Sequence, residues 1–122
     1  MQKVEHIGIA VKSLSDAIPV FEKLLNTACY KREVIESEQV ETAFFMQGDT
    51  KIELLQSMVE NSVIEKFINK RGSGLHHIAF EVENIEEEIQ RLQQAGFTVL
   101  NPTPKRGADN KLVCFVHPAN TL

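Results

Sequence analysis

Apolar and polar residues alternate in two closely similar stretches of the chain. Residues 6–11 read HIGIAV and residues 77–82 read HIAFEV, each with a histidine at its head. Side chains of an extended strand alternate between its two faces. Both stretches therefore predict a β-strand whose bulky apolar residues, such as Ile7 and Ile9, face one side while the histidine faces the other.

The similarity continues beyond these strands, at a constant offset of 71 residues, into one helix in each half. The helices are expected at 14–26 and 85–95, where apolar residues recur at the helical period. Pairs that resemble capping boxes precede them, namely Ser13 with Asp16 and Asn84 with Glu87. A repeat of this kind constrains the architecture of the whole chain.

The segments that follow each helix are typical of strands. Strands are expected at 28–37, 38–46, 51–57, 97–104 and 111–118, with Gly48-Asp49 as a hairpin turn and an amphipathic helix at 62–72. Each half thus reads as β-α-β-β-β, with the last strand of the second half missing. We expect a single α+β domain over residues 1–122, with module 1 at about 1–60, a linking helix at about 61–72 and module 2 at about 73–122.

Composition narrows the class of protein. The 122 residues are 43% hydrophobic and 25% charged, with a net charge of -4, as in an ordinary soluble domain. The acidic balance argues against nucleic-acid binding, and no apolar run reaches the roughly 20 residues of a membrane span. The N-terminus lacks the pattern of a secretory signal, and Cys29 and Cys114 form no metal or redox motif. A cytoplasmic location is therefore expected.

Two histidines are the first candidates for chemistry. Strand alternation places His6 and His77 on the face opposite the bulky apolar residues. The residues that share this face are small and can line a cleft: Gly8, Ala10 and Ala79. His76 has the opposite parity, so His77 is preferred to His76.

An acid in a predicted central strand is the third candidate. Glu53 alternates with Ile52 and Leu54, and a carboxylate among apolar residues is costly unless it is paired or bound to a metal. Two histidines and one glutamate converging from three strands would suit a divalent metal. The alternative is that each histidine is a hydrogen-bonded residue of the core or its rim. The repeat favours the metal site, because a pseudo-two-fold axis brings equivalent positions together around one centre.

The repeat also predicts a partner for Glu53. Asp49-Thr50 align with Asn120-Thr121, so the position equivalent to Glu53 lies just past Leu122. We interpret this as a truncated chain, because the loss of a final strand would leave a sheet edge exposed.

Four motifs span nearly the whole chain: HIGIAV, GDTKIELL, IEKFINKRGSGLHHIAFEV and GADNKLVCFVHP. Together they resemble the methylmalonyl-CoA epimerase family of the vicinal oxygen chelate (glyoxalase) superfamily. The resemblance implies two paired modules that form a cup-shaped mixed sheet around a divalent metal. It implies His6, Glu53 and His77 as metal ligands. The family's fourth ligand, a glutamate in a terminal strand, has no counterpart in the sequence.

The resemblance implies an enzyme that interconverts (R)- and (S)-methylmalonyl-CoA through a metal-stabilised enolate. Such an epimerase needs two general bases, and Glu53 is a candidate because a metal-bound glutamate often serves as a base in the superfamily. Some epimerases carry a further glutamate where this chain has Thr42. The adjacent Glu41 has the opposite parity and is not assigned a role. Lys105 and Arg106 are candidates for binding the phosphates of coenzyme A, the alternative being a solvated basic loop.

Other members of the superfamily offer alternative functions. These are a lactoylglutathione lyase of the glyoxalase I type, an extradiol dioxygenase and a metal-free small-molecule binding module. The KRG and GLHHIAFEV segments favour the epimerase over the lyase. Dioxygenase chains are usually longer, and the binding modules typically lose the histidine and glutamate positions. The metal could be cobalt, nickel, manganese or zinc, and the resemblance implies a homodimer.

Overall fold

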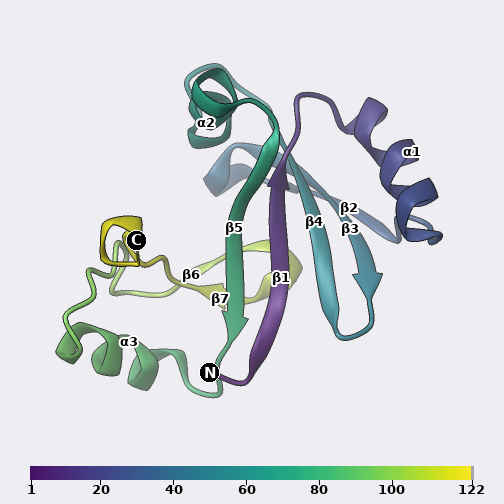
Figure 1. Cartoon of the computed structure of the whole chain (residues 1–122). Helices are drawn as coiled ribbons and strands as arrows, with labels where there is room; N and C mark the ends of the chain where they lie inside the picture. Colours follow the sequence, from purple (N-terminus) through teal and green to yellow (C-terminus); the bar gives the residue numbers. More distant parts are fainter. Residues whose placement is uncertain (122) are drawn as a thin grey trace. The chain divides into compact units, whose positions relative to one another are not determined.

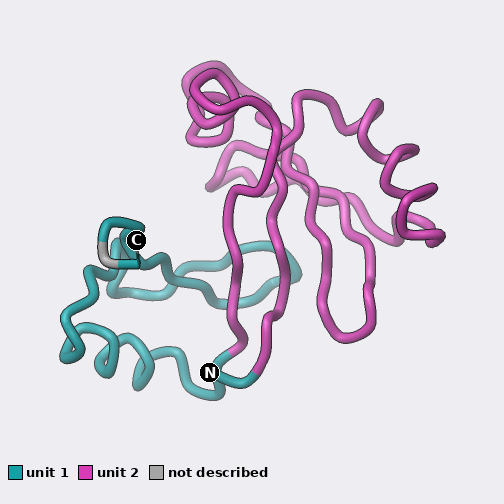
Figure 2. Tube along the Cα trace, viewed as in Figure 1, with its two compact units in different colours: residues 1–2, 82–122 teal, residues 3–81 magenta. Residues whose placement is uncertain are grey.

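The computed structural model describes residues 1–121, apart from the side chain of Asn120. Its helices and strands (Figure 1) are β1 (Lys3–Ala10), α1 (Leu14–Leu25), β2 (Lys31–Ile35), β3 (Val40–Gln47), β4 (Thr50–Ser57), α2 (Val63–Arg71), β5 (Gly74–Glu81), α3 (Ile85–Gln94), β6 (Lys105–Arg106) and β7 (Leu112–Val113). The chain divides into two compact units, residues 3–81 and residues 1–2 with 82 onward (Figure 2).

The larger unit contains a five-stranded sheet in the order β2-β3-β4-β1-β5. The β1 and β4 strands run parallel, whereas β2–β3, β3–β4 and β1–β5 are antiparallel pairs. The prediction of an α+β fold with a mixed sheet is confirmed.

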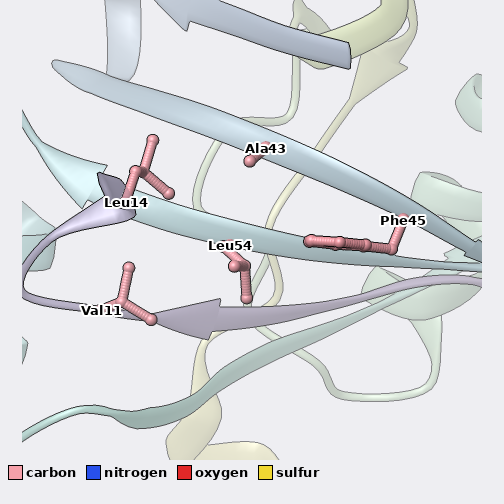
Figure 3. Close-up of a cluster of buried hydrophobic side chains, with 5 residues drawn as sticks. All are labelled: Val11, Leu14, Ala43, Phe45 and Leu54. Carbon is pink, nitrogen blue, oxygen red and sulfur yellow. The ribbon is translucent and has the colours of Figure 1, made fainter. Parts of the chain in front are cut away.

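One face of this sheet is covered by α1, and the core of the unit lies between them. Its buried side chains, drawn in Figure 3, are Val11, Leu14, Ala43, Phe45 and Leu54. Ile9 of β1 and Ile52 of β4 pack against this cluster. Since side chains alternate along a strand, the intervening residues of β1 and β4 face the opposite side of the sheet.

Side-chain caps begin all three helices. The backbone N–H groups of the third helical residues donate to the caps: Asp16 to Ser13 Oγ at 3.2 Å, Glu65 to Ser62 Oγ at 3.0 Å and Glu87 to Asn84 Oδ1 at 3.1 Å. The observed helices agree with the predicted ones to within one residue at each end. A capping signal is local in sequence, which explains this agreement.

The smaller unit contains α3 and the short β6–β7 hairpin. Ile89, Leu92 and Val99 form its buried apolar cluster. The two strands predicted at 97–104 and 111–118 are shorter than expected. They pair at Val99–Val116 and at β6–β7, with an interruption around Pro102 and Pro104, which lack the N–H that a ladder needs.

The predicted repeat is visible in the pairing of β1 with β5. Ile7 lies directly opposite Ile78, its equivalent 71 residues later. His6 lies opposite Ala79, and His77 lies opposite Gly8. These two pairs are exchanged by the repeat, so a local pseudo-two-fold axis passes between the isoleucines. The division into modules at about residues 60 and 73 stays a prediction.

The helices were also inspected for membrane spans. Within residues 1–121, none combines the length and the apolar composition that crossing a bilayer would need.

Candidate metal centre

His6, Glu53 and His77 come together on one side of the five-stranded sheet. They come from three adjacent strands, β1, β4 and β5. One potential ligand atom from each residue lies within 4.8 Å of the other two. The structure therefore brings together the three residues that the sequence selected as metal ligands.

The two imidazoles face each other through the same ring nitrogen. His6 Nε2 lies 2.9 Å from His77 Nε2, and the rings meet edge to face with centroids 5.1 Å apart. Glu53 Oε1 lies 3.5 Å from His6 Nε2 and 3.6 Å from His77 Nε2. Two atoms bound to one ion at about 2.0 to 2.2 Å are separated by roughly 3 to 3.5 Å. The donor set and its spacing fit a divalent cation.

Glu53 is the most deeply buried member of the group, with 3% of its surface exposed. Its neighbour across the β3–β4 pair is Phe44, which is also buried, and its neighbour on β1 is Gly8. An ionised carboxylate in such surroundings is costly unless cationic or hydrogen-bonding groups compensate it. A bound cation would provide that compensation.

The close approach of His77 to β1 depends on Gly8. A Cβ atom at position 8 would overlap the His77 imidazole at three of its ring atoms. The small residue that the sequence placed on this face therefore has a specific purpose, which is to admit the ring over the β1 backbone.

Both histidines are also held at their second ring nitrogen. Glu5 Oε1 lies 2.6 Å from His6 Nδ1, and His76 Nδ1 lies 2.8 Å from His77 Nδ1. Lys51 Nζ lies 2.8 Å from the other oxygen of Glu5. The sequence analysis did not select Glu5, His76 or Lys51. The repeat offered a signal for two of them, since Glu5 aligns with His76 at the same offset of 71 residues.

The expectation that strand alternation turns His76 away from His77 is wrong. The pairing of β1 with β5 shifts register between Gly8–His77 and Ile9–Leu75, which leaves His76 as an extra residue on β5. Such a bulge interrupts the alternation of side chains and redirects the extra residue. His76 consequently lies beside the ring of His77, with its other side edge-on to Phe67 of α2.

The surroundings of Glu5 and His76 shift their pKa values. Burial acts to raise the pKa of Glu5, but hydrogen bonds from Lys51 and His6 outweigh it and the net pKa is lowered. Burial lowers the pKa of His76, and the neighbouring His77 lowers it further. The ionised carboxylate of Glu5 and the neutral imidazole of His76 are thus favoured.

Thr42 and Glu41 occupy the positions that the parity of β3 predicts. Thr42 is buried and lies opposite Leu55, on the face of the sheet that carries Glu53. Glu41 has the opposite parity and pairs with Arg32 at 3.0 Å. The chain therefore presents a hydroxyl, not a carboxylate, where some epimerases have a second glutamate.

Lys105 and Arg106 form β6 in the smaller unit. The ammonium group of Lys105 lies 5.1 Å from the centre of the Phe115 ring, and Arg106 Nη1 donates to the carbonyl of Asn110 at 2.8 Å. The structure does not bring them together with the histidines in one unit, and their role in binding coenzyme A stays a prediction.

A family model identifies the class of protein that this fold and site define. Residues 5–115 match the Glyoxalase/Bleomycin resistance protein/Dioxygenase superfamily. The chain belongs to this superfamily, as its motifs predicted.

Individual relatives narrow the comparison to epimerases. The chain is 36% identical over 118 residues to the ethylmalonyl-CoA/methylmalonyl-CoA epimerase of Cereibacter sphaeroides, covering 95% of this chain and 88% of that protein. It is also 36% identical over 121 residues to the uncharacterized protein YqjC of Bacillus subtilis, covering 99% and 86%. A solved variant of the Streptomyces coelicolor methylmalonyl-CoA epimerase, in complex with 2-nitronate-propionyl-CoA, has a TM-score of 0.92 and 27% identity, covering 99% and 88%.

Proposed function

We propose that this protein is a metal-dependent epimerase that interconverts (R)- and (S)-methylmalonyl-CoA. The observation that carries the proposal is the convergence of His6 Nε2, His77 Nε2 and Glu53 Oε1 within one unit. The similarity to epimerases that act on alkylmalonyl-CoA thioesters supports the substrate class.

His6, Glu53 and His77 would hold a divalent ion, with cobalt, nickel, manganese and zinc all compatible with nitrogen and carboxylate ligands. When bound, the ion would supply Lewis acidity that favours an enolate over the neutral thioester. Each histidine binds through Nε2 in this proposal, because Nδ1 of each ring is already engaged.

The reaction requires a proton to leave the carbon between the thioester and the carboxylate. Its bonding electrons pass to the thioester oxygen, and a proton then returns on the opposite face of the planar enolate. We assign Glu53 as the candidate base on one face, because its carboxylate lies at the centre of the site and a positioned carboxylate can serve as a general base.

We also propose that Lys105 and Arg106 bind the phosphates of coenzyme A. Both carry positive charge, and Arg106 presents a guanidinium suited to phosphate oxygens. Replacing both by alanine should raise the KM for methylmalonyl-CoA several-fold while kcat stays close to that of the wild type, because the phosphates lie far from the reacting carbon. Steady-state kinetics measure this split, and an unchanged KM would contradict the assignment.

The cytoplasmic location and the homodimer also stay proposals. Light scattering of the purified protein measures its mass in solution, and a monomer would contradict the dimer.

The substrate class is tested by offering the purified, Co²⁺-loaded protein two substrates in parallel. We expect interconversion of the methylmalonyl-CoA epimers and no conversion of the hemithioacetal of methylglyoxal and glutathione. His6→Ala and His77→Ala should each abolish the turnover while unfolding stays cooperative. Conversion of the hemithioacetal alone would identify a lactoylglutathione lyase, and conversion of neither substrate would contradict the epimerase.

A further inference from the structure

The residues that precede the two metal-ligand histidines form a second symmetric pair. Glu5 and His76 are equivalent in the repeat, and each contacts Nδ1 of the histidine that follows it, at 2.6 Å and 2.8 Å. Adjacent residues of a regular strand point to opposite faces, so these contacts need a local departure from regular pairing.

The β1–β5 ladder supplies this departure twice. One register shift lies between Val4–Phe80 and His6–Ala79, which makes Glu5 an extra residue on β1. The other makes His76 an extra residue on β5. Bulges of this kind redirect a side chain and are frequent beside active sites. Each strand thus places one bulge residue directly beside its own ligand.

The contacts at Nδ1 determine which nitrogen is presented to the centre of the site. With Nδ1 engaged by Glu5 or His76, each ring directs Nε2 inward, and these two atoms lie 2.9 Å apart. A hydrogen bond at the remote nitrogen fixes the tautomer and the orientation of a ligating imidazole.

The two contacts differ in charge although the repeat makes them equivalent in position. Glu5 presents a carboxylate that Lys51 holds from its other oxygen at 2.8 Å. His76 presents an imidazole, packed edge-on to Phe67 with ring centroids 4.9 Å apart. A carboxylate partner raises the basicity of a ligating histidine, whereas an imidazole partner orients the ring without adding charge.

We propose that Glu5 and His76 are positioning residues of the metal centre, and that the Lys51–Glu5 pair makes His6 a stronger ligand than His77. This inference rests on the proposed metal site. It assigns a role to two residues that do not themselves touch the metal.

The test is a titration of the purified metal-free protein with Co²⁺, followed by visible absorption and calorimetry. Glu5→Ala should weaken Co²⁺ binding by about 10- to 100-fold, as losses of such outer contacts typically do, and should shift the absorption bands of the bound ion. Glu5→Gln, whose amide oxygen can still accept from Nδ1, should fall between Glu5→Ala and the wild type. His76→Leu should weaken binding less than Glu5→Ala does.

Two further variants complete the experiment. Lys51→Met removes the partner of Glu5 without changing either residue beside a histidine, and it should weaken binding in the same direction. Glu41→Gln removes a carboxylate that pairs with Arg32 at 3.0 Å, away from the ligands, and it should leave the affinity and the spectrum unchanged. Thermal unfolding followed by circular dichroism identifies any variant that fails to fold, and the remaining variants then decide the result.

The outcomes separate this inference from the proposed function. Wild-type affinity and spectrum in folded Glu5→Ala and His76→Leu would overturn the inference and leave the epimerase intact. Graded weakening in the variants of a protein that shows no epimerase activity would support the inference and contradict the proposed reaction. A wild-type protein that binds no Co²⁺ would overturn both.

Discussion

Gly8 determines where the His77 imidazole can lie. The ring crosses β1 at the one position whose residue has no Cβ, and a methyl group there would overlap three of its atoms. The backbone of Gly8 does not adopt a positive φ, so its role is to provide space for a neighbouring side chain. A metal centre can therefore be lost without a change to any of its ligands.

Gly8→Ala should lower the affinity for Co²⁺ by about tenfold or more, since displacement of a ligand ring costs at least as much as the loss of its outer contact. Titration with Co²⁺ measures the change. Gly74→Ala is the matched control, because a Cβ at position 74 would have no heavy atom within 4 Å. Equal affinities for the two alanine variants would contradict the role given to Gly8.

At this scale the sequence predicted the ligands but not the residues that hold them. His6 and His77 could be selected because alternation and the repeat agree on them. His76 was misplaced and Glu5 was overlooked because both occupy bulges, which arise from the pairing of β1 with β5. A bulge depends on two strands that are distant in sequence, and the alternation within one strand does not reveal it.

Among the helices, α2 is tied to the sheet through its cap. Ser62 is 1% exposed, and its Oγ accepts from the N–H of Glu65 and lies 2.5 Å from the Oγ of Ser57 in β4. The same hydroxyl thus begins the helix and connects it to the strand that carries Glu53.

Ser62→Ala should lower the free energy of unfolding by about 1 to 2 kcal/mol, the upper range for the loss of an N-cap, because the variant also leaves a buried partner hydroxyl. Urea unfolding measures this difference. Ser13→Ala removes a cap whose hydrogen bond is exposed and should cost less. A larger loss for Ser13→Ala would contradict the connection through Ser57.

The elements differ in how well the sequence predicted them, and the difference has a physical cause. Helix ends were predicted to within a residue because a cap and its helix are adjacent in the chain. The strands of the smaller unit were predicted too long, since Pro102 and Pro104 were included in a run that needs backbone donors.

For the whole molecule, the main consequence is that the candidate metal centre is built within one compact unit. His6, Glu53 and His77 all belong to residues 3–81, whereas the cluster of Ile89, Leu92 and Val99 belongs to the other unit. The repeat predicted the pairing of equivalent strands but not this division, because β5 of the second module pairs with β1 of the first.

Leu92→Ala should destabilise the smaller unit by about 2 to 5 kcal/mol, the usual cost of truncating a buried leucine. Hydrogen exchange should rise in residues 85–116, while the affinity for Co²⁺ stays within about twofold, as expected for independent sites. Leu54→Ala truncates the cluster beside Glu53 and should weaken Co²⁺ binding. Loss of Co²⁺ binding in Leu92→Ala would contradict a centre confined to residues 3–81.

The most direct test of the account is the exchange of the α-proton of methylmalonyl-CoA in heavy water, measured with added Co²⁺ and with a chelator. The account predicts rapid incorporation of deuterium by the Co²⁺-loaded protein, its arrest by the chelator, and its absence in His77→Ala. Exchange that the chelator leaves unchanged, or no exchange by the loaded wild type, would contradict a metal-dependent epimerase.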